Sequence, residues 1–289
     1  MSPLLPRPKP NGTFRLTNDY RRLNRYYPTK DATTQIDVWR KMWEVNPAWR
    51  YFLEIDVKDG FFSIPVDDLL SRQFGFCYNT RRYRWTRLPQ GWSWSSILFH
   101  ERIAEILRGI PCLQYADNVL VGARSPEELL EVTNQVFLRF RDFGIKVNFD
   151  KVKWCTQRIK FLGHEICDGQ WSQEGYIQEQ MAQVGRVARM RDLEHVIGII
   201  SYACRAILDT EKILGPLRER LKEWKAGPVS EEWKDQLNVE VAAAFRTALD
   251  NIRWLALPGS PADSYVFVIE SDWSSGHAAY MLFARKGDE

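Results

Sequence analysis

Cysteine is scarce, and its spacing excludes two classes of small domain. The five cysteines among 289 residues include no CxxC pair and no zinc-ligand spacing, and their number is odd. We therefore expect neither a disulfide framework nor a structural zinc site. A reducing compartment fits this cysteine usage best.

Long apolar runs are also missing. No segment resembles a signal peptide or a membrane span, so we expect an intracellular protein with no membrane partner. No internal repeat or low-complexity tract occurs, which disfavours a repeat architecture. With 45% hydrophobic residues, the chain is long enough to form two or three packed subdomains.

Positive charge is in small excess, because 40 Lys and Arg residues stand against 37 Asp and Glu residues. A net charge of +3 does not by itself identify a nucleic-acid-binding protein. Its distribution says more, because basic residues gather in groups that interleave with Tyr and Trp, a pattern suited to phosphate contacts and base stacking. Solvated helix faces give the same pattern, so no single group decides. The groups are Arg21, Arg22 and Arg25; Arg81, Arg82, Arg84 and Arg87; Lys151, Lys153, Arg158 and Lys160; Arg218, Arg220 and Lys222.

Apolar periodicity predicts strands and helices that mix without a βαβ rhythm, so the expected fold class is α+β. The clearest helix start has Ser125 as N-cap, Pro126 at the first helical position and Glu128 three residues on, with an end before Gly144. The predicted strands cover residues 13–16, 51–57, 74–78, 82–86, 145–149, 159–167 and 265–270. The predicted helices cover residues 37–44, 95–108, 126–143, 192–205, 213–224 and 239–252.

Two acids carry the candidate chemistry. Asp117 stands in a tight polar turn between two short apolar runs, and Asp56 ends another apolar stretch 61 residues earlier. Phosphoryl transfer needs two cations held by such carboxylates, because Mg²⁺ prefers hard oxygen ligands and keeps several waters. A plain polar hairpin turn is the alternative for Asp117. The nearby Asp59, Asp67 and Asp68 fit solvation or helix capping better than metal binding.

The order of several motifs resembles the reverse transcriptase of long-terminal-repeat retroelements, including gypsy-type retrotransposons and retroviruses. The resemblance is collinear over nearly the whole chain. It rests on Asp19-Tyr20-Arg21-Arg22-Leu23-Asn24, Ile55-Asp56-Val57-Lys58-Asp59-Gly60-Phe61-Phe62, Leu88-Pro89-Gln90-Gly91, Tyr115-Ala116-Asp117-Asn118, Phe161-Leu162-Gly163-His164 and Gly215-Pro216-Leu217.

This resemblance implies a right-hand polymerase with fingers, a palm built on an antiparallel sheet, and a helical thumb. The expected fingers are residues 1–28 and 64–94, and the expected palm is residues 29–63 and 95–170. Residues 171–226 would form the thumb, and residues 227–289 a connection leading into a truncated ribonuclease-H-like segment.

The resemblance also implies a role for each matching residue. The catalytic set would be Asp56, Asp117 and Asn118, with Mg²⁺, or Mn²⁺ in its place, held by Asp56, Asp117 and the Val57 carbonyl. Phe61 would crowd the second carbon of the sugar and reject ribonucleotides, which implies DNA synthesis. The implied dNTP-binding residues are Lys9, Arg15, Asp59, Gly60, Phe61, Gln90 and Gly91. The implied primer or template contacts are Tyr115, Lys151, Phe161, Leu162 and Gly163.

Asn118 departs from the family, which has two aspartates here. An amide loses a full negative charge, so the activity of an RNA- and DNA-directed DNA polymerase would be impaired. An engineered knockout, a decayed copy and a working variant all remain open. The alternative function is an inactive nucleic-acid-binding or structural subunit. The implied partners are an RNA or DNA template with its primer and dNTPs, with a homodimer left open.

The two ends depart as well. Met1 falls inside the expected fingers, and Asp272 matches the first metal ligand of a ribonuclease H domain whose later acids do not follow. We therefore expect a polymerase core cut from a larger polyprotein, or a free-standing remnant. Its expected location is the cytoplasm, the nucleus or a virus-like particle.

Overall fold

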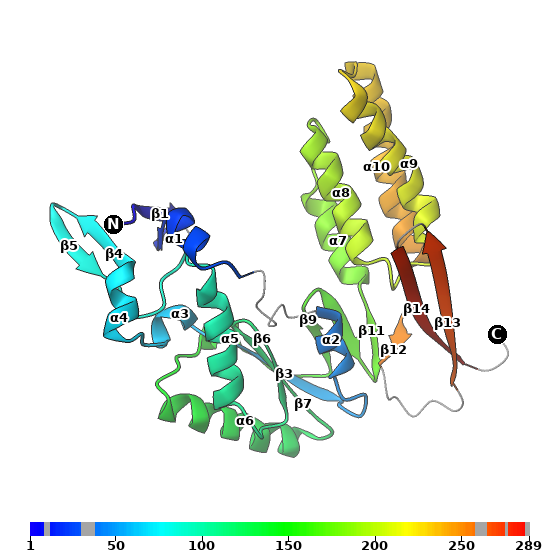
Figure 1. The fold of residues 1–289 in the computed structure, drawn as a ribbon. Coiled ribbons are helices and arrows are strands. Elements are labelled where there is room, and N and C mark those ends of the chain that lie inside the picture. Colours follow the sequence, from blue (N-terminus) through cyan, green and yellow to red (C-terminus); the bar gives the residue numbers. More distant parts are fainter. Residues whose placement is uncertain (9–11, 30–37, 258–264, 275–276, 287–289) are drawn as a thin grey trace.

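The computed structural model describes residues 1–8, 12–29, 38–257, 265–274 and 277–286. For Trp39, Arg40 and the last two segments it describes the backbone alone. Two antiparallel sheets form the middle of the molecule. Short hairpins at one end and a bundle of helices at the other rise from these sheets on the same side (Figure 1). No helix in the described part of the chain is both long and apolar enough to cross a membrane.

The N-terminal lobe consists of two hairpins and short helices. Its first hairpin begins at Leu4 and its second turns at Asn79 and Thr80, which both have positive φ. The elements are β1 (Leu4–Pro8), β2 (Phe14–Asn18), α1 (Arg21–Tyr26), α3 (Gly60–Ser63), α4 (Asp68–Ser71), a 3-10 helix (Arg72–Phe74), β4 (Gly75–Tyr78) and β5 (Arg81–Arg84).

The central sheet is antiparallel in the order β6-β7-β3-β8. Side chains alternate along each strand. On β3, Leu53 and Ile55 pack with helices α5 and α6, whereas Phe52 on the opposite face packs against Met42 and Trp49. The elements are α2 (Val38–Trp43), β3 (Tyr51–Asp56), α5 (Trp94–Ile106), β6 (Cys112–Tyr115), β7 (Asn118–Ala123), α6 (Pro126–Asp142), a 3-10 helix (Phe149–Lys151) and β8 (Lys153–Thr156).

A second antiparallel sheet, in the order β12-β11-β10-β9, joins the central sheet to the helical lobe. Strand β9 lies against β3, and β12 returns from the far end of the chain to pair with β11. The elements are β9 (Arg158–Phe161), β10 (His164–Cys167), β11 (Gln170–Ser172) and β12 (Leu255–Ala256). The base of the helical lobe is therefore tied to the sheet at both ends.

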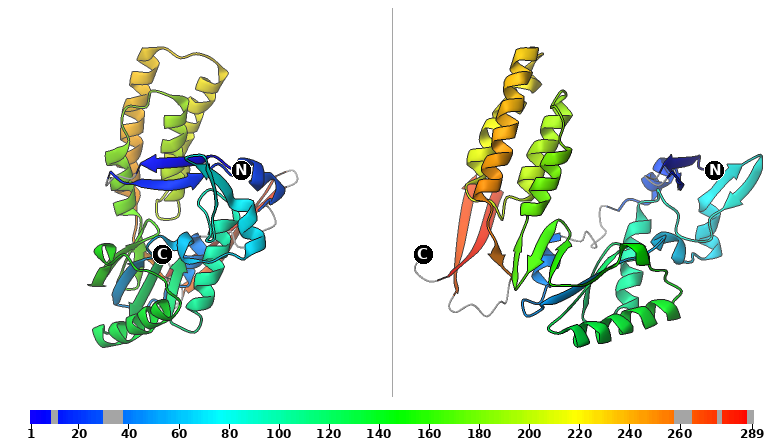
Figure 2. Two further views of the ribbon diagram at one scale, coloured as in Figure 1. Left: turned by 90° about the vertical axis from the view of Figure 1, so that its left-hand side faces the viewer. Right: turned by 180° about the vertical axis from the view of Figure 1, so that it is seen from behind.

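The helical lobe consists of four helices. They run roughly alongside one another (Figure 2). Leu237, Val241 and Phe245 of α10 are buried in the same core as α7, α8 and α9. The elements are α7 (Glu174–Gln183), α8 (Met190–Tyr202), α9 (Thr210–Ala226) and α10 (Glu231–Asn251), followed by the hairpin of β13 (Tyr265–Ser274) and β14 (His277–Lys286). The predicted thumb boundary at residues 226/227 thus falls between two helices that share a core.

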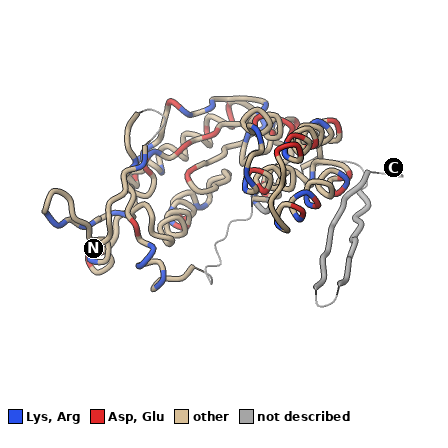
Figure 3. Tube along the Cα trace, turned by 90° about the horizontal axis from the view of Figure 1, so that it is seen from above, with Lys and Arg blue, Asp and Glu red and all other residues tan. Residues whose placement is uncertain are grey.

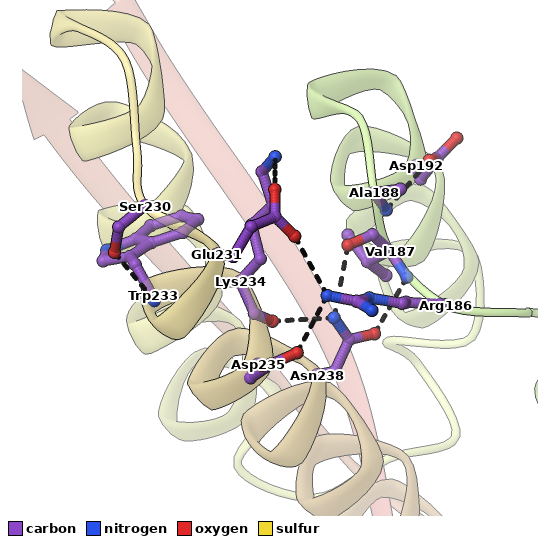
Figure 4. A network of polar contacts seen from close by, with 10 residues as sticks. All are labelled: Arg186, Val187, Ala188, Asp192, Ser230, Glu231, Trp233, Lys234, Asp235 and Asn238. Carbon is purple, nitrogen blue, oxygen red and sulfur yellow. Dashed lines mark hydrogen bonds and ion pairs between the residues drawn. The ribbon is translucent and has the colours of Figure 1, made fainter.

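Polar contacts fasten α10 to the loop before α8 (Figure 4). The Arg186 guanidinium lies 3.1 Å from Glu231 and 2.9 Å from Asp235. The Asn238 side chain accepts from the Val187 N–H and donates to the Val187 carbonyl, at 2.8 Å and 3.2 Å. Because the Arg186 ion pairs are exposed, we attribute the docking of α10 mainly to its buried apolar face.

The structure confirms the α+β class and most of the predicted elements. Ser125 caps α6 by accepting from the Glu128 N–H. The strand predicted over residues 145–149 is wrong, because Val147 alone bridges to Val57. The strand predicted over residues 159–167 is a hairpin, since Leu162 and Gly163 have positive φ. The helix predicted from residue 239 begins eight residues earlier, at Glu231.

Candidate active site

The turn between β6 and β7 consists of two residues, Ala116 and Asp117. Tyr115 pairs with Asn118 across it. Ala116 has φ 51°, the left-handed conformation that tight hairpin turns require and that a small side chain tolerates better than a bulky one. The turn leaves the Asp117 side chain exposed at the tip of the hairpin.

Asp56 lies directly beside this turn. In the antiparallel register of β3 and β7, Asp56 stands opposite Asn118, and the Val57 N–H donates to the Asp117 carbonyl at 2.8 Å. The Asp56 carbonyl accepts from the Asn148 N–H at 2.9 Å. Backbone hydrogen bonds therefore hold the two acidic residues at neighbouring strand ends, although 61 residues separate them in the sequence.

Lys151 lies at the Asp56 carboxylate. Its Nζ is 3.1 Å from Asp56 Oδ2, and the Asp56 side chain is only 19% exposed. The next basic residue along the chain, Lys153, forms a hydrogen-bonded ion pair with Glu54 on the same strand as Asp56. The family resemblance implied a primer or template contact for Lys151, and the structure places its ammonium group at a candidate metal ligand.

The donors gathered here suit a hard divalent cation. No group of three or more His, Cys, Asp and Glu side chains that could hold a metal occurs among the described residues. The candidate ligands are the carboxylates of Asp56 and Asp117 and the backbone carbonyl of Val57, the residue that follows Asp56. Such an all-oxygen set with few protein ligands fits Mg²⁺, which keeps several of its waters.

The segment after Asp56 forms a tight corner. Asp59 is in the left-handed conformation, and a Cβ at Gly60 would lie 2.6 Å from the Phe99 ring, so the backbone here packs directly on α5. The half-buried Phe61 packs edge-on against Phe99 at 5.5 Å, and Phe62 stacks on Trp85 at 5.1 Å. Both aromatic side chains thus have packing partners, in addition to the sugar contact predicted for Phe61.

The backbone of Gly91 lies very close to the backbone of Asn18. It has φ +104°, and a Cβ at this position would overlap the carbonyl oxygen of Asn18. The Asn18 N–H in turn donates to the Gln90 carbonyl at 3.1 Å. The half-buried Gln90 side chain has a buried Oε1 with no hydrogen-bond partner in the part of the chain that the structure describes. The loop predicted to approach the nucleotide is therefore fastened to β2.

Arg15 is exposed on β2 and faces Arg7 of β1 in the register of that hairpin. Lys9 lies outside the described residues. Figure 3 shows Lys and Arg along the N-terminal lobe, and residues of both signs mixed along the helical lobe. The helical-lobe group is largely paired internally, since Arg218 contacts Glu211 and Arg220 contacts Glu240, each at 2.5 Å. For that group the solvated-helix interpretation holds.

The turn between β9 and β10 lies near the hairpin. Phe161 is buried, and Leu162 and Gly163 form the two-residue turn. Leu162 and Tyr115 pack against the same hydrophobic core. Four of the residues implied for the primer thus lie at these two turns, Tyr115 at the end of β6 and Phe161, Leu162 and Gly163 at the β9–β10 turn, whereas Lys151 lies at Asp56.

Comparison with known proteins decides the family. The profile described as reverse transcriptase (RNA-dependent DNA polymerase) matches residues 7–166, more than half of the chain. The chain belongs to the reverse transcriptase family. The chain is 27% identical over 219 residues to the Pro-Pol polyprotein of feline foamy virus, covering 75% of the chain and 19% of that relative. It is 25% identical over 284 residues to the Gag-Pol polyprotein of avian reticuloendotheliosis virus, covering 93% and 24%.

Solved structures agree on the fold. The foamy viral protease-reverse transcriptase in complex with double-stranded DNA superposes with a TM-score of 0.77 at 21% identity, covering 98% of this chain and 49% of that one. The foamy viral protease-reverse transcriptase in complex with an RNA/DNA hybrid gives a TM-score of 0.73 at 20% identity, covering 98% of this chain and 37% of that one. The chain spans about a fifth of the length of the curated foamy-virus relatives that it matches. The gypsy-type subgroup stays a prediction.

Two contacts of the site were not predicted. One joins Lys151 to Asp56, and the other joins the Tyr202 hydroxyl to the Leu162 carbonyl at 2.8 Å. Each connects residues that are 40 or more positions apart. The periodicity of a single sequence indicates local structure only, so it could not predict either of these two long-range contacts.

Proposed function

We propose that this chain is the polymerase part of a reverse transcriptase, which extends a primer with dNTPs on an RNA or DNA template. The observation that carries the proposal is the register of β3 and β7, which sets Asp56 beside the Asp117 turn in a chain of this family. Two carboxylates at adjacent strand ends are what nucleotidyl transfer requires of the protein.

In this proposal Asp56, Asp117 and the Val57 carbonyl hold Mg²⁺, which supplies positive charge at the reacting phosphate when bound. The protein's own part is positioning. Asp59 and Gly60 present backbone to the triphosphate at the corner packed on Phe99. Arg15 contributes a guanidinium that can form paired hydrogen bonds with phosphate oxygens.

Three further groups complete the proposed nucleotide site. Gln90 and Gly91 border it from the loop fastened to β2, and Lys9 remains a proposed contact from the first hairpin. Phe61 sets the sugar preference. The primer end lies against Tyr115 and the β9–β10 turn. The domain ranges proposed from the resemblance, and a homodimer, stay predictions that limited proteolysis and light scattering can test.

Asn118 lowers the activity in this proposal. The residue is half-buried on β7, directly opposite Asp56, so an aspartate there would add negative charge next to the metal ligands. Loss of one well-placed electrostatic group typically costs about 10²–10³ in rate. Asn118→Asp should raise the rate by that factor, measured as dTTP incorporation on poly(rA)/oligo(dT) with Mg²⁺ or Mn²⁺.

The second candidate function is a non-catalytic subunit that binds nucleic acid, which Asn118 favours. It predicts that template–primer binding falls with salt and does not respond to dNTP. The polymerase proposal predicts the opposite response, a tighter complex when the next correct dNTP is present. Binding measured with and without dNTP, on a dideoxy-terminated primer, separates the two.

A further inference from the structure

The β9–β10 turn is held from the helical lobe. The Leu162 carbonyl receives the Tyr202 hydroxyl at 2.8 Å, and His164 Nδ1 lies 2.8 Å from the same oxygen. A carbonyl oxygen can only accept, so both side chains donate and the His164 proton sits on Nδ1. Tyr202 is the last residue of α8, so this bond connects the end of a thumb helix to a turn of the sheet.

The turn needs such support because of its own sequence. Leu162 has φ 51° and Gly163 has φ 75°, and consecutive left-handed residues favour Asn-Gly over Leu-Gly. A leucine in the left-handed region is strained, since its Cβ crowds the backbone. The Tyr202 hydroxyl donates its hydrogen bond to the carbonyl of this strained leucine.

The surrounding rings leave the turn little room to move. A Cβ at Gly163 would lie 3.2 Å from the Tyr202 ring and 3.4 Å from the Tyr176 ring. The Tyr176 and Tyr202 rings are 5.1 Å apart. Burial raises the pKa of Tyr202 to about 12, and the neighbouring Tyr176 and Tyr115 add to the shift. Tyr202 therefore remains a neutral donor, within electrostatic reach of the catalytic hairpin.

We propose that Tyr202 is a positioning residue that fixes the Phe161–Gly163 turn against the catalytic hairpin, so that the end of α8 sets where the primer 3′ end lies. The inference rests on the proposed function, because that function places the primer at this turn. It adds a direct mechanical link between the thumb and the primer terminus.

The test uses Tyr202→Phe, which removes the hydroxyl and keeps the ring. Tyr176→Phe is the matched control, because Tyr176 belongs to the same ring cluster but its hydroxyl makes no hydrogen bond within the described residues. The probe is a template–primer with 2-aminopurine as the primer 3′-terminal base, whose fluorescence reports how that base stacks. This readout needs no catalytic turnover.

We expect Tyr202→Phe to bind the duplex within twofold of the unaltered chain but to change the fluorescence of the terminal base. The incorporation rate should fall about five- to tenfold at an unchanged KM for dNTP, because that factor corresponds to the free energy of one neutral hydrogen bond. Tyr176→Phe should match the unaltered chain in all three measurements.

Fluorescence and rate equal to those of the unaltered chain in Tyr202→Phe would overturn the inference. An equal effect of Tyr176→Phe would overturn it too, because packing of the rings would then account for the result. If Tyr202→Phe lowers the thermal midpoint sharply, Gly163→Ala replaces it, since its Cβ would press the Tyr202 ring; the same fluorescence change is expected. Failure of the unaltered chain to bind the duplex would refute the proposed function itself.

Discussion

Replacing Gly91 by alanine should destabilise the protein far more than the same change at another left-handed glycine. Gly91 has φ +104°, and its new Cβ would overlap the Asn18 carbonyl oxygen, which belongs to rigid backbone. Gly109 has φ +84° and nothing within 4 Å of a built Cβ, so Gly109→Ala adds the backbone strain without the overlap. The pair isolates the steric contribution.

The magnitudes follow from these two contributions. An alanine in the left-handed region costs about 1–2 kcal/mol. Forcing an atom into a well-packed position typically costs a further 1–3 kcal/mol. We therefore expect the free energy of unfolding to fall by about 1 kcal/mol in Gly109→Ala and by about 3–4 kcal/mol in Gly91→Ala, measured by urea denaturation.

The denaturant slope should stay the same in both variants, because the surface exposed on unfolding does not change. Equal losses of stability in the two variants would refute the reasoning. If Gly91→Ala instead kept full stability and only raised the KM for dNTP, the glycine would serve approach to the nucleotide and not the contact with Asn18.

Three further predictions concern the site. Phe61→Val should lower the preference for dNTP over rNTP about 10- to 100-fold, measured as the ratio of kcat/KM; an unchanged ratio would remove Phe61 from the sugar contact. Lys151→Met should lower the Mg²⁺ concentration for half-maximal rate with little change in the thermal midpoint, because an ion pair whose lysine is exposed to solvent contributes only about 0–1 kcal/mol; an unchanged Mg²⁺ dependence would contradict this. Burial lowers the pKa of His164 to about 4 from 6.5, so the unfolded chain binds the proton first as the pH falls. Stability should drop by about 1.5 kcal/mol between pH 6.5 and 5, because the slope reaches about 1.4 kcal/mol per pH unit only below the unfolded pKa, and it should drop less in His164→Gln; equal slopes for the two proteins would contradict it.

Sequence signals predicted the structure correctly where interactions between residues close in the chain determine the backbone conformation. Ser125, Pro126 and Glu128 located the start of α6 because capping is a local interaction. The alternation of Ile145 to Phe149 was misleading: the period of a strand is present, but only Val147 finds a partner in the sheet. Pairing of strands depends on the tertiary fold, so alternation alone could not exclude a loop.

The site was predicted in part for the same reason. Asp117 between two apolar runs indicated a hairpin turn, and the family resemblance supplied Asp56 as its partner. The resemblance also assigned Gly91 to the nucleotide, whereas the structure shows its closest neighbour to be Asn18. Contacts such as that of Tyr202 with Leu162 arise only when the helical lobe packs on the sheet. They are properties of the assembled fold, and composition or spacing cannot show them.

The central claim is that Asp56 and the Asp117 turn together form a polymerase site. The most direct measurement is the rate of dTTP incorporation on poly(rA)/oligo(dT) in Mg²⁺ for the unaltered chain, Asn118→Asp, and Asn118→Asp combined with Asp56→Asn. The account predicts slow extension by the unaltered chain, a rate about 10²–10³ higher in Asn118→Asp, and loss of that gain when Asp56 is replaced. A rate that does not depend on Asp56, or no extension by any of the three proteins, would contradict it.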